Sequence, residues 1–346
     1  GSLRRAEILI IEVTDEMYDV YGLGNALVDM EYTVDDGFLR SHGIPKGHMT
    51  LVDEPTMERL AAGLDGHSAE RMSGGSAANT LIAVQGFGAR TFYSCKVADD
   101  STGRHFLDDL NRAGIATNRN AADADGHSGR CLVLITPDAE RSMNTFLGIS
   151  SELTRAELDE QALSRSRYFY AEGYMSSAEG SRDAAIAARE LAEAEGVKTA
   201  LSLSDPSMVE FFRDNLVRIL GNGVDHLFCN EEEALTWART DRLDVAVTEL
   251  KDIGRHLNVT LGARGSLSVT PMGQKLVAGF PANAVDTTGA GDIYAGGCLY
   301  GWTRGMDPDE AAALGNFAAA ALIQAYGARL RSKEQYARTL RDFQRR

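Results

Sequence analysis

The sequence of 346 residues has few cysteines and no long hydrophobic run. Its four cysteines, at positions 95, 131, 229 and 298, form no Cys-X-X-Cys pair and have no matching histidine spacing. A zinc site or a disulfide framework is therefore not expected, and a reducing cytoplasm is the expected compartment. No stretch approaches about 18 apolar residues, so we expect no transmembrane helix and no membrane partner.

Basic residues are also scarce. Lysine and arginine number 35 against 50 acidic residues, which gives a formal net charge of −15. Because no basic run with interleaved aromatic residues occurs, we expect no nucleic-acid partner. The same charge would be expected to repel an anionic ligand. The content of 44% hydrophobic and 25% charged residues is that of an ordinary globular protein. At about 150 residues per domain, the length allows roughly two domains.

Two common nucleotide-binding motifs are missing. The P-loop pattern Gly-X4-Gly-Lys-[Ser/Thr] occurs nowhere, which excludes a P-loop NTPase at the level of the motif. Gly22-Leu23-Gly24 ends a predicted strand but lacks the third glycine of a dinucleotide-binding fingerprint. A Rossmann-type dinucleotide site is therefore not expected.

What is present is a regular alternation of apolar strands and amphipathic helices from about residue 155. Helices such as 183–195 and 206–220 separate strands near 167–172, 198–204, 225–229 and 258–262. This order indicates βαβ units and a parallel, doubly wound sheet. Two short strands, 266–270 and 275–280, then precede a helical C-terminal part.

We therefore predict a three-layer α/β/α fold with a doubly wound sheet and a small β-sheet lid. The core domain is expected to comprise residues 17–30, 56–127 and 149–346, and the lid residues 31–55 and 128–148. Within the lid, the segment 31–53 has too little apolar surface for a core element, so it is expected to be a strand-rich flap.

The most informative stretch is 286–297, a polar, glycine-rich loop that runs directly into an apolar helix. The first amides of a helix have no internal partner and lie at the positive end of the dipole. Gly289 and Gly291 would let those amides approach an anion closely. Asp292 follows in the first turn, where a carboxylate would take the proton of a hydroxyl that attacks a phosphate. The alternative is a capped helix that follows a tight turn.

Residues 286–297 resemble the C-terminal signature of the ribokinase-like (PfkB) carbohydrate and nucleoside kinases, and 73–80 resemble the N-terminal signature. The resemblance implies a ribokinase-like fold and an ATP- and Mg²⁺-dependent kinase. It makes Asp292 the base and assigns the amides of Gly289, Ala290 and Gly291 to the transferred phosphoryl group. It also makes Asp286 part of a loop that can hold a monovalent cation such as K⁺.

The acceptor side follows the first strand, at 18–24. The polar residues Asn25 and Asp29 come after its carboxyl end, where ligands bind in open α/β sheets. The resemblance implies that Asp29 accepts hydrogen bonds from two sugar hydroxyls, and that Gly74, Gly75 and Asn79 complete this sugar-binding site. Asp29 could instead be a turn residue and Asn79 a helix-surface amide.

The flap supplies one further candidate. Arg141 follows the flap turn and would reach a phosphate when the lid closes, which also excludes water. An exposed strand arginine is the alternative for Arg141.

On the nucleotide side, 230–233 resembles the family's Asn-X-X-Glu motif, with Asn230 and Glu233 as its ends. Glu233 would hold Mg²⁺ through water, or the glutamates 231–233 would simply complement a helix dipole. The segment 260–265 is similar to the one that lines the ATP phosphates. Its candidates are Thr260, Gly262 and Gly265, and Asn316 is a further candidate for the adenine edge or the cation loop.

The signatures do not choose the phosphoryl acceptor. The blocks 18–53, 136–141 and 168–174 look like those of bacterial family members assigned as adenosine kinases. A nucleoside needs an apolar slot for its base, for which Tyr174, Met49 and Leu134 are candidates, with ordinary packing as the alternative. We expect the 5′-hydroxyl of adenosine to be phosphorylated. A ribose or fructose kinase and a non-catalytic nucleotide-binding protein are the alternatives, and both monomer and homodimer stay open.

Overall fold

The computed structural model describes residues 18–118, 120–122, 125–138 and 140–346. Residue 17, at the start of the expected core domain, and residue 139, in the flap turn, lie outside the described residues, as do 119 and 123–124. Within the described part, no helix is both long and apolar enough to cross a membrane.

Nine strands of the described chain form the larger sheet, in the order β14-β13-β12-β11-β10-β9-β1-β5-β6. Strands β6 to β12 in this order pair in parallel, whereas β13 and β14 are antiparallel additions at one edge. Their bounds are β1 Tyr18–Leu23, β5 Thr91–Ser94, β6 Ala116–Thr117, β9 Ser166–Glu172, β10 Lys198–Ser202, β11 Val224–Asn230, β12 Gly254–Thr260, β13 Gly265–Thr270 and β14 Gly273–Ala278.

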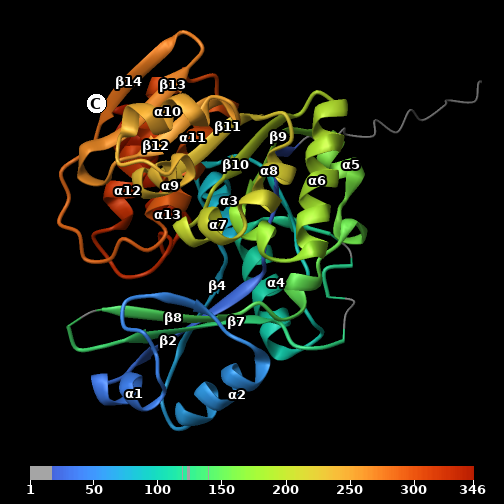
Figure 1. The fold of residues 1–346 in the computed structure, drawn as a ribbon, viewed down its shortest axis with the longest axis vertical. Helices are drawn as coiled ribbons and strands as arrows, with labels where there is room; N and C mark the ends of the chain where they lie inside the picture. The colour runs from blue at the N-terminus through green and yellow to red at the C-terminus, as the bar shows by residue number, and fades with distance from the viewer. Residues whose placement is uncertain (1–17, 119, 123–124, 139) are drawn as a thin grey trace, which may run out of the picture.

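Helices cover both faces of this sheet, which confirms the three-layer prediction (Figure 1). One layer contains α3 Ser76–Phe87, α4 Ser101–Ala113, α11 Ala290–Thr303, α12 Pro308–Leu322 and α13 Lys333–Gln344. The other contains α5 Glu160–Ser164, α6 Glu179–Ala194, α7 Pro206–Phe211, α8 Arg213–Leu220, α9 Glu231–Ala238 and α10 Leu243–Leu250. Successive side chains of β1 point to opposite faces of the sheet and pack against different helix layers. Val20 belongs to one buried cluster and Tyr21 to the other.

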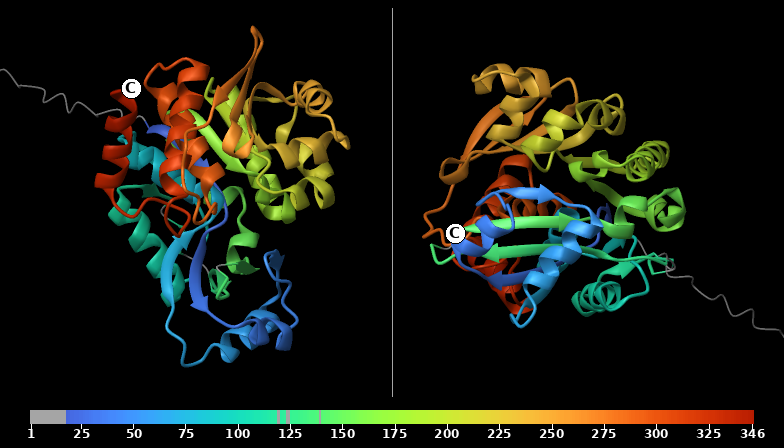
Figure 2. Two further views of the ribbon diagram at one scale, coloured as in Figure 1. Left: turned by 90° about the vertical axis from the view of Figure 1, so that its left-hand side faces the viewer. Right: turned by 60° about the horizontal axis from the view of Figure 1, so that its bottom comes forward.

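A second sheet lies apart from the first, with the order β3-β8-β7-β2-β4 (Figure 1). Its strands are β2 Leu27–Thr33, β3 Met49–Leu51, β4 Glu70–Gly74, β7 Gly129–Ile135 and β8 Arg141–Phe146. Helices α1 Asp36–Ser41 and α2 Glu54–Gly63 cover the face that points away from the large sheet (Figure 2). This small sheet is called the lid below.

The segment 31–53 is not rich in strands, contrary to the sequence prediction. It contains the last three residues of β2, the helix α1 and the three-residue strand β3, and Leu39 and Ile44 are buried. Few apolar residues suffice there because α2, just beyond the segment, supplies Met57 and Leu60 to the same layer. Strand β4 and the start of β2 also come from stretches that the prediction gave to the core. The division into two domains stays a prediction.

The topology reverses between β1 and β9. The chain leaves β1 through the lid and returns by α3 on one face, whereas α6, which follows β9, lies on the other face. Ligands bind at the carboxyl ends of strands at such a reversal. Short 3-10 helices lie near these ends, namely η1 Gly148–Glu152, η2 Arg155–Glu157, η3 Gly173–Ser177 and η4 Gly262–Arg264.

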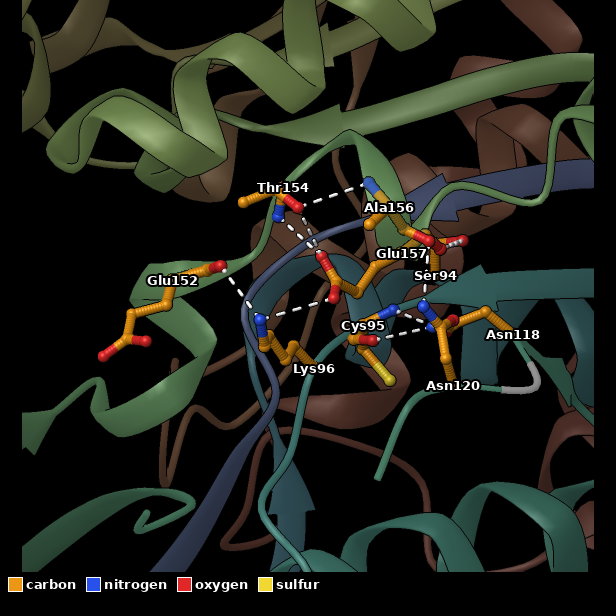
Figure 3. A network of polar contacts seen from close by, with 9 residues as sticks. All are labelled: Ser94, Cys95, Lys96, Asn118, Asn120, Glu152, Thr154, Ala156 and Glu157. Atoms are coloured by element: carbon orange, nitrogen blue, oxygen red, sulfur yellow. Dashed lines mark hydrogen bonds and ion pairs between the residues drawn. The ribbon is translucent and has the colours of Figure 1, made fainter. Parts of the chain in front are cut away.

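A polar network anchors the chain where it returns from the lid to the core (Figure 3). Lys96 Nζ, just after β5, lies 3.3 Å from Glu157 Oε1 and donates to the carbonyl oxygen of Glu152 at 3.2 Å. The other carboxylate oxygen of Glu157 accepts hydrogen bonds from the amide and hydroxyl of Thr154, at 2.7 and 3.0 Å. Since only 7% of the Glu157 side chain is exposed, its charge depends on these partners.

Replacing Lys96 with methionine is expected to lower the free energy of unfolding by about 3 kcal/mol, because it leaves a buried carboxylate without its cation. Urea denaturation measures the change. Adding Glu157→Gln to the Lys96→Met variant should recover much of the loss, since the unpaired charge is then gone. An unchanged midpoint in the single variant would contradict a stabilising ion pair.

Candidate active site

A cavity of about 760 Å³ lies between the carboxyl ends of the core strands and the lid. Its floor comes from residues at the ends of β9, β10, β11 and β12 and from the start of α11, and lid strands β3, β7 and β8 form its roof. Predicted residues that line it are Asn25, Asp29, Met49, Gly75, Asn79, Tyr174, Asn230, Glu233, Thr260, Gly262, Gly289, Ala290, Gly291 and Asp292. The structure therefore brings the acceptor-side and nucleotide-side predictions into one cavity.

The turn that starts α11 is built for close approach by a ligand. Gly289 caps the helix with a φ of +76°, and a Cβ there would collide with the backbone of Ala328. Gly291 is exposed, with no protein atom within 4 Å of the place where its Cβ would be. The amide of Ala290, the first residue of α11, donates to the carbonyl oxygen of Thr287 at 3.1 Å. The amides of Gly291 and Asp292 that follow have no acceptor within the helix, so they are available to an anion in the cavity.

Asp292 is held by two side chains of α3. Ser76 Oγ donates to Asp292 Oδ1 at 2.7 Å, and Asn79 Nδ2 donates to Oδ2 at 3.3 Å. Burial raises the pKa of Asp292 to about 7, although the two hydrogen bonds act in the opposite direction. A carboxylate with a pKa near neutrality is suited to accept a proton and release it again.

Asp29, in β2, faces the cavity from the lid side. Burial raises the pKa of Asp29 to about 7, as does the negative charge of Glu31, whereas Arg329 and Arg141 lower it. A Cβ at Gly74 would overlap the Asp29 carboxylate, so glycine there permits this approach, although Gly74 itself does not line the cavity.

Two amide oxygens in the same cavity lack a partner. The side-chain oxygens of Asn25 and Asn79 are buried and accept no hydrogen bond from the residues that the structure describes. Buried polar atoms are normally satisfied, so unpaired acceptors that line a cavity are suited to ligand donors such as hydroxyl groups. The side-chain nitrogen of Asn79 is therefore bound to Asp292, whereas its side-chain oxygen is open to a ligand in the cavity.

Sequence reasoning missed Glu172, at the end of β9. Its Oε1 accepts from the amide of Asn25 at 2.9 Å, and its Oε2 accepts from the amide of Ala77 at 2.7 Å. The side chain is almost fully buried, and burial raises the pKa of Glu172 to about 7. It thereby fixes both the turn after β1 and the start of α3. The one available signal was an isolated glutamate at the end of the apolar stretch 168–171.

Asn230 and Glu233 form a reciprocal capping box at the start of α9. Asn230 Oδ1 accepts from the Glu233 amide at 2.7 Å, and Glu233 Oε2 accepts from the Asn230 amide at 3.0 Å. The motif therefore has a structural role, and both residues also line the cavity. Burial raises the pKa of Glu233 to about 7, with a contribution from the negative charge of Asp205.

The carboxylate of Glu233 fits a Mg²⁺ ion held through water, because Mg²⁺ prefers oxygen ligands and keeps much of its hydration shell. Among the described residues, no group of three or more histidine, cysteine, aspartate or glutamate side chains is arranged to hold a metal ion directly.

Besides Gly74, Arg141 and Asp286, three further predicted residues do not line the cavity. Leu134 is buried inside the lid, because alternate residues of β7 face opposite sides and Cys131 is the one that lines the cavity. Asn316 Nδ2 donates to the carbonyl oxygen of Val277 at 3.0 Å, which ties α12 to β14. Gly265 starts β13, where a side chain would collide with β14.

Arg141 is buried between the lid and the loop before α11, contrary to the alternative of an exposed strand arginine. Its Nη2 pairs with Glu31 of β2, and its Nη1 lies 3.2 Å from Asp286 Oδ2. Asp286 also accepts from the amides of Thr288 and Gly327, each at 2.9 Å. The lid thus carries a positive charge to the edge of the glycine turn.

Comparison with known proteins identifies relatives of the whole chain. A sequence model of the pfkB family carbohydrate kinases matches residues 53–335. The adenosine kinase of Saccharomyces cerevisiae is 27% identical over 327 residues, which cover 88% of this chain and 94% of that protein.

Two solved structures have the same fold along nearly their full lengths. A probable sugar kinase from Rhizobium etli has a TM-score of 0.87 and 30% identity, and it covers 94% of this chain and 99% of its own. The adenosine kinase from Sinorhizobium meliloti has a TM-score of 0.85 and 35% identity with the same coverage. The names of these relatives divide between nucleoside and sugar acceptors.

Proposed function

The chain belongs to the pfkB family of carbohydrate kinases, and from that premise we propose that it transfers the γ-phosphoryl group of ATP to the 5′-hydroxyl of adenosine, giving AMP. The family supports a phosphotransferase that acts on an alcohol. One observation carries the assignment of the reacting centre, namely Asp292, which is oriented by Ser76 and Asn79 beside the glycine turn at 289–291.

In the proposed reaction the acceptor is held by oxygen atoms that have no other partner. Asp29 accepts hydrogen bonds from two ribose hydroxyls, and the free amide oxygens of Asn25 and Asn79 accept others. These contacts direct the 5′-hydroxyl toward Asp292. As its oxygen forms the new bond to phosphorus, Asp292 takes the hydroxyl proton, and the bond between the γ-phosphorus and the β-γ bridging oxygen breaks.

The donor side supplies charge stabilisation. The amides of 289–291 stabilise the negative charge on the transferred group, and Thr260 and Gly262 border the same end of the cavity. Mg²⁺ would neutralise the phosphates of bound ATP, with Glu233 and Asn230 as the nearby protein oxygens. Arg141 is suited to add a positive charge while the lid is closed.

Three further expectations stay predictions. They are a monovalent cation near Asp286, the cytoplasmic location and the monomeric or homodimeric state.

The roof of the cavity favours a nucleoside over a free sugar. Lid residues Met49, Leu51, Met143 and Leu147 line it with apolar side chains, and Tyr174 lines it from the core side. A free sugar would leave this apolar surface without a partner, whereas a base would cover it. The identity to an adenosine kinase of known structure agrees with that choice. The sparse aromatic content of the roof is the observation that keeps a sugar kinase as the second candidate.

An acceptor screen tests the substrate. ADP release should be measured with adenosine, inosine, ribose and fructose at equal ATP and Mg²⁺. We expect kcat/KM for adenosine to exceed that for ribose by about 10–100-fold, because base contacts are worth roughly 1–3 kcal/mol. Turnover of free sugars without turnover of nucleosides would make the chain a sugar kinase. No turnover with any alcohol would favour a non-catalytic nucleotide-binding protein.

A further inference from the structure

A buried arginine outside the cavity links three distant segments. Arg329 lies in the loop between α12 and α13, and only 12% of its side chain is exposed. Its Nη1 donates to Ser73 Oγ at 3.0 Å, and its Nη2 pairs with the Oδ2 atom of Asp109 in α4. The amide of Ser73 donates to the same Asp109 oxygen at 3.3 Å, and the Ser73 hydroxyl donates to it as well. The three side chains form a closed network.

One end of this network is the acceptor side of the cavity. Ser73 is followed by Gly74, which lies against the Asp29 carboxylate, and by Gly75, which precedes α3. The first residues of α3 include Ser76 and Asn79, the two donors to Asp292. A shift of Ser73 would therefore move both the anchor of the acceptor and the support of the base.

The other end is the glycine turn. Ala328, directly before Arg329, packs so closely on Gly289 that no side chain fits between them. Gly327, one residue earlier, donates its amide to Asp286 at 2.9 Å. The backbone that carries Arg329 thus supports the turn whose amides face the phosphoryl group. The ion pair with Asp109 holds that backbone at a fixed distance from Ser73.

The charge of Arg329 also acts on the cavity. The groups that influence Asp29 are Glu31 on its own strand, Arg141 from β8, Asp292 from α11 and Arg329 from the C-terminal loop. Burial, Glu31 and Asp292 raise the pKa of Asp29, and the two arginines lower it. The thiol of Cys131 on β7, which Asp29 in turn affects, is neutral because burial raises its pKa far above the usual range. Arg329 therefore favours the ionised form of Asp29 that accepts hydrogen bonds.

We propose that Arg329 is a positioning residue that fixes the spacing between the acceptor anchor Asp29 and the phosphoryl-stabilising turn 289–291, through Ser73 and Asp109. This proposal rests on the kinase activity proposed above. Arg329 touches neither reactant, so its effect on the reaction passes through the residues that it holds.

The test compares Arg329→Gln with Arg331→Gln, which alters an exposed arginine of the same loop. We expect Arg329→Gln to lower kcat/KM for the acceptor by about 10–100-fold, the range that a small misplacement produces. KM for ATP should stay close to that of the wild type, and Arg331→Gln should match the wild type throughout. A role in folding alone would lower the melting temperature without this split between the two substrates.

The pH profile separates positioning from charge. Without the Arg329 cation the pKa of Asp29 rises further, so the acidic limb of kcat/KM for the acceptor should move to higher pH. Arg329→Lys should keep the limb in place but lose rate, because lysine retains the charge without the two-pronged contact. Ser73→Ala, which removes the hydroxyl contacts of β4 with Arg329 and Asp109 and keeps the amide contact with Asp109, should lower kcat/KM in the same direction as Arg329→Gln.

A failure of the Arg329 proposal can be distinguished from a failure of the proposed kinase activity. A wild-type protein without turnover on any alcohol would refute the kinase activity itself. An active wild type whose Arg329→Gln and Ser73→Ala variants keep its kcat, acceptor KM and pH profile below their melting temperatures would overturn the role of Arg329 and leave the kinase activity standing.

Discussion

Replacing Asp292 with asparagine is expected to lower kcat by about 10²–10⁴-fold while KM changes little, because asparagine keeps the shape and the position beside Ser76 but cannot accept the hydroxyl proton. Steady-state kinetics with saturating ATP and acceptor measure the effect. Asp65→Asn, at an exposed position of the lid, is the matched control and should keep full activity. Retained wild-type turnover in the Asp292 variant would rule out this residue as the base.

The same variant should not be less stable than the wild type at pH 8. Because the folded-state pKa of Asp292 is raised to about 7, the folded protein binds more protons than the unfolded chain between the usual aspartate pKa and 7. Stability contributed by this group is therefore lost as the pH rises through that window. Asparagine removes this cost, so the melting temperature at pH 8 should equal or exceed that of the wild type. A clear drop would indicate that the carboxylate mainly serves the fold.

Replacing Gly291 with alanine is expected to lower kcat by about 10²–10³-fold, the size of the loss when one donor of an oxyanion site no longer reaches its acceptor. The variant keeps the backbone amide, but its methyl group would enter the open space beside the turn, where we expect it to hold the phosphoryl group away from the amides. The melting temperature should consequently stay unchanged. Kinetics and thermal unfolding of the same preparation test both halves of this expectation.

Gly289→Ala provides the contrast. Its backbone has a positive φ, and its methyl group would collide with Ala328, so this variant should lose both stability and activity. If Gly291→Ala were fully active while Gly289→Ala lost only stability, the turn would be a structural cap and not an anion site.

The elements that could be predicted from the sequence were those with a local cause. The alternation between 155 and 262 predicted β9 to β12 and the intervening helices, because each strand contains a short apolar stretch between polar segments. The predicted strand 258–262 overlaps only the end of β12, Gly254–Thr260, whose first half includes the polar residues Arg255 and His256. The predicted helix 206–220 is instead divided into α7 and α8 around Phe212. Helix α1 was missed because a six-residue helix with one fully buried side chain has almost no periodic signal.

The site was predictable where one segment carries its own chemistry. The 286–297 loop combines a glycine-rich helix start with a carboxylate, a pattern that predicts a phosphate site, and residues 287–292 do line the cavity. Ser76 and Glu172 could not be found in that way, because their partners lie 216 and 147 residues away in the chain. Leu134 was chosen by residue type, whereas the register of β7 decides which residues face the cavity. The chemistry of single residues cannot predict these contacts, because they depend on how distant segments of the chain fold together.

Part of the acidic charge of the chain lies at the cavity. Asp29, Glu172, Glu233 and Asp292 all line the cavity, and burial raises the pKa of each to about 7. Such groups titrate as a coupled set, so the acidic limb of the rate profile will belong to the set and not to one residue. An anionic nucleotide can enter this acidic cavity only with compensating positive charge. This agrees with the expected need for Mg²⁺ and for Arg141, which the lid carries to the edge of the glycine turn.

The contact between Asp292 and α3 also has a consequence for the newly made protein. A growing polypeptide emerges from the ribosome at about 5–20 residues per second, N-terminus first. Helix α3 is complete long before α11 exists, since Ser76 and Asp292 are separated by 216 residues, and Arg329 emerges later still. If Asp292 is the base that we propose, the nascent chain carries its acceptor-side residues for most of its synthesis without that base. A fragment that ends before α11 is then expected to be inactive.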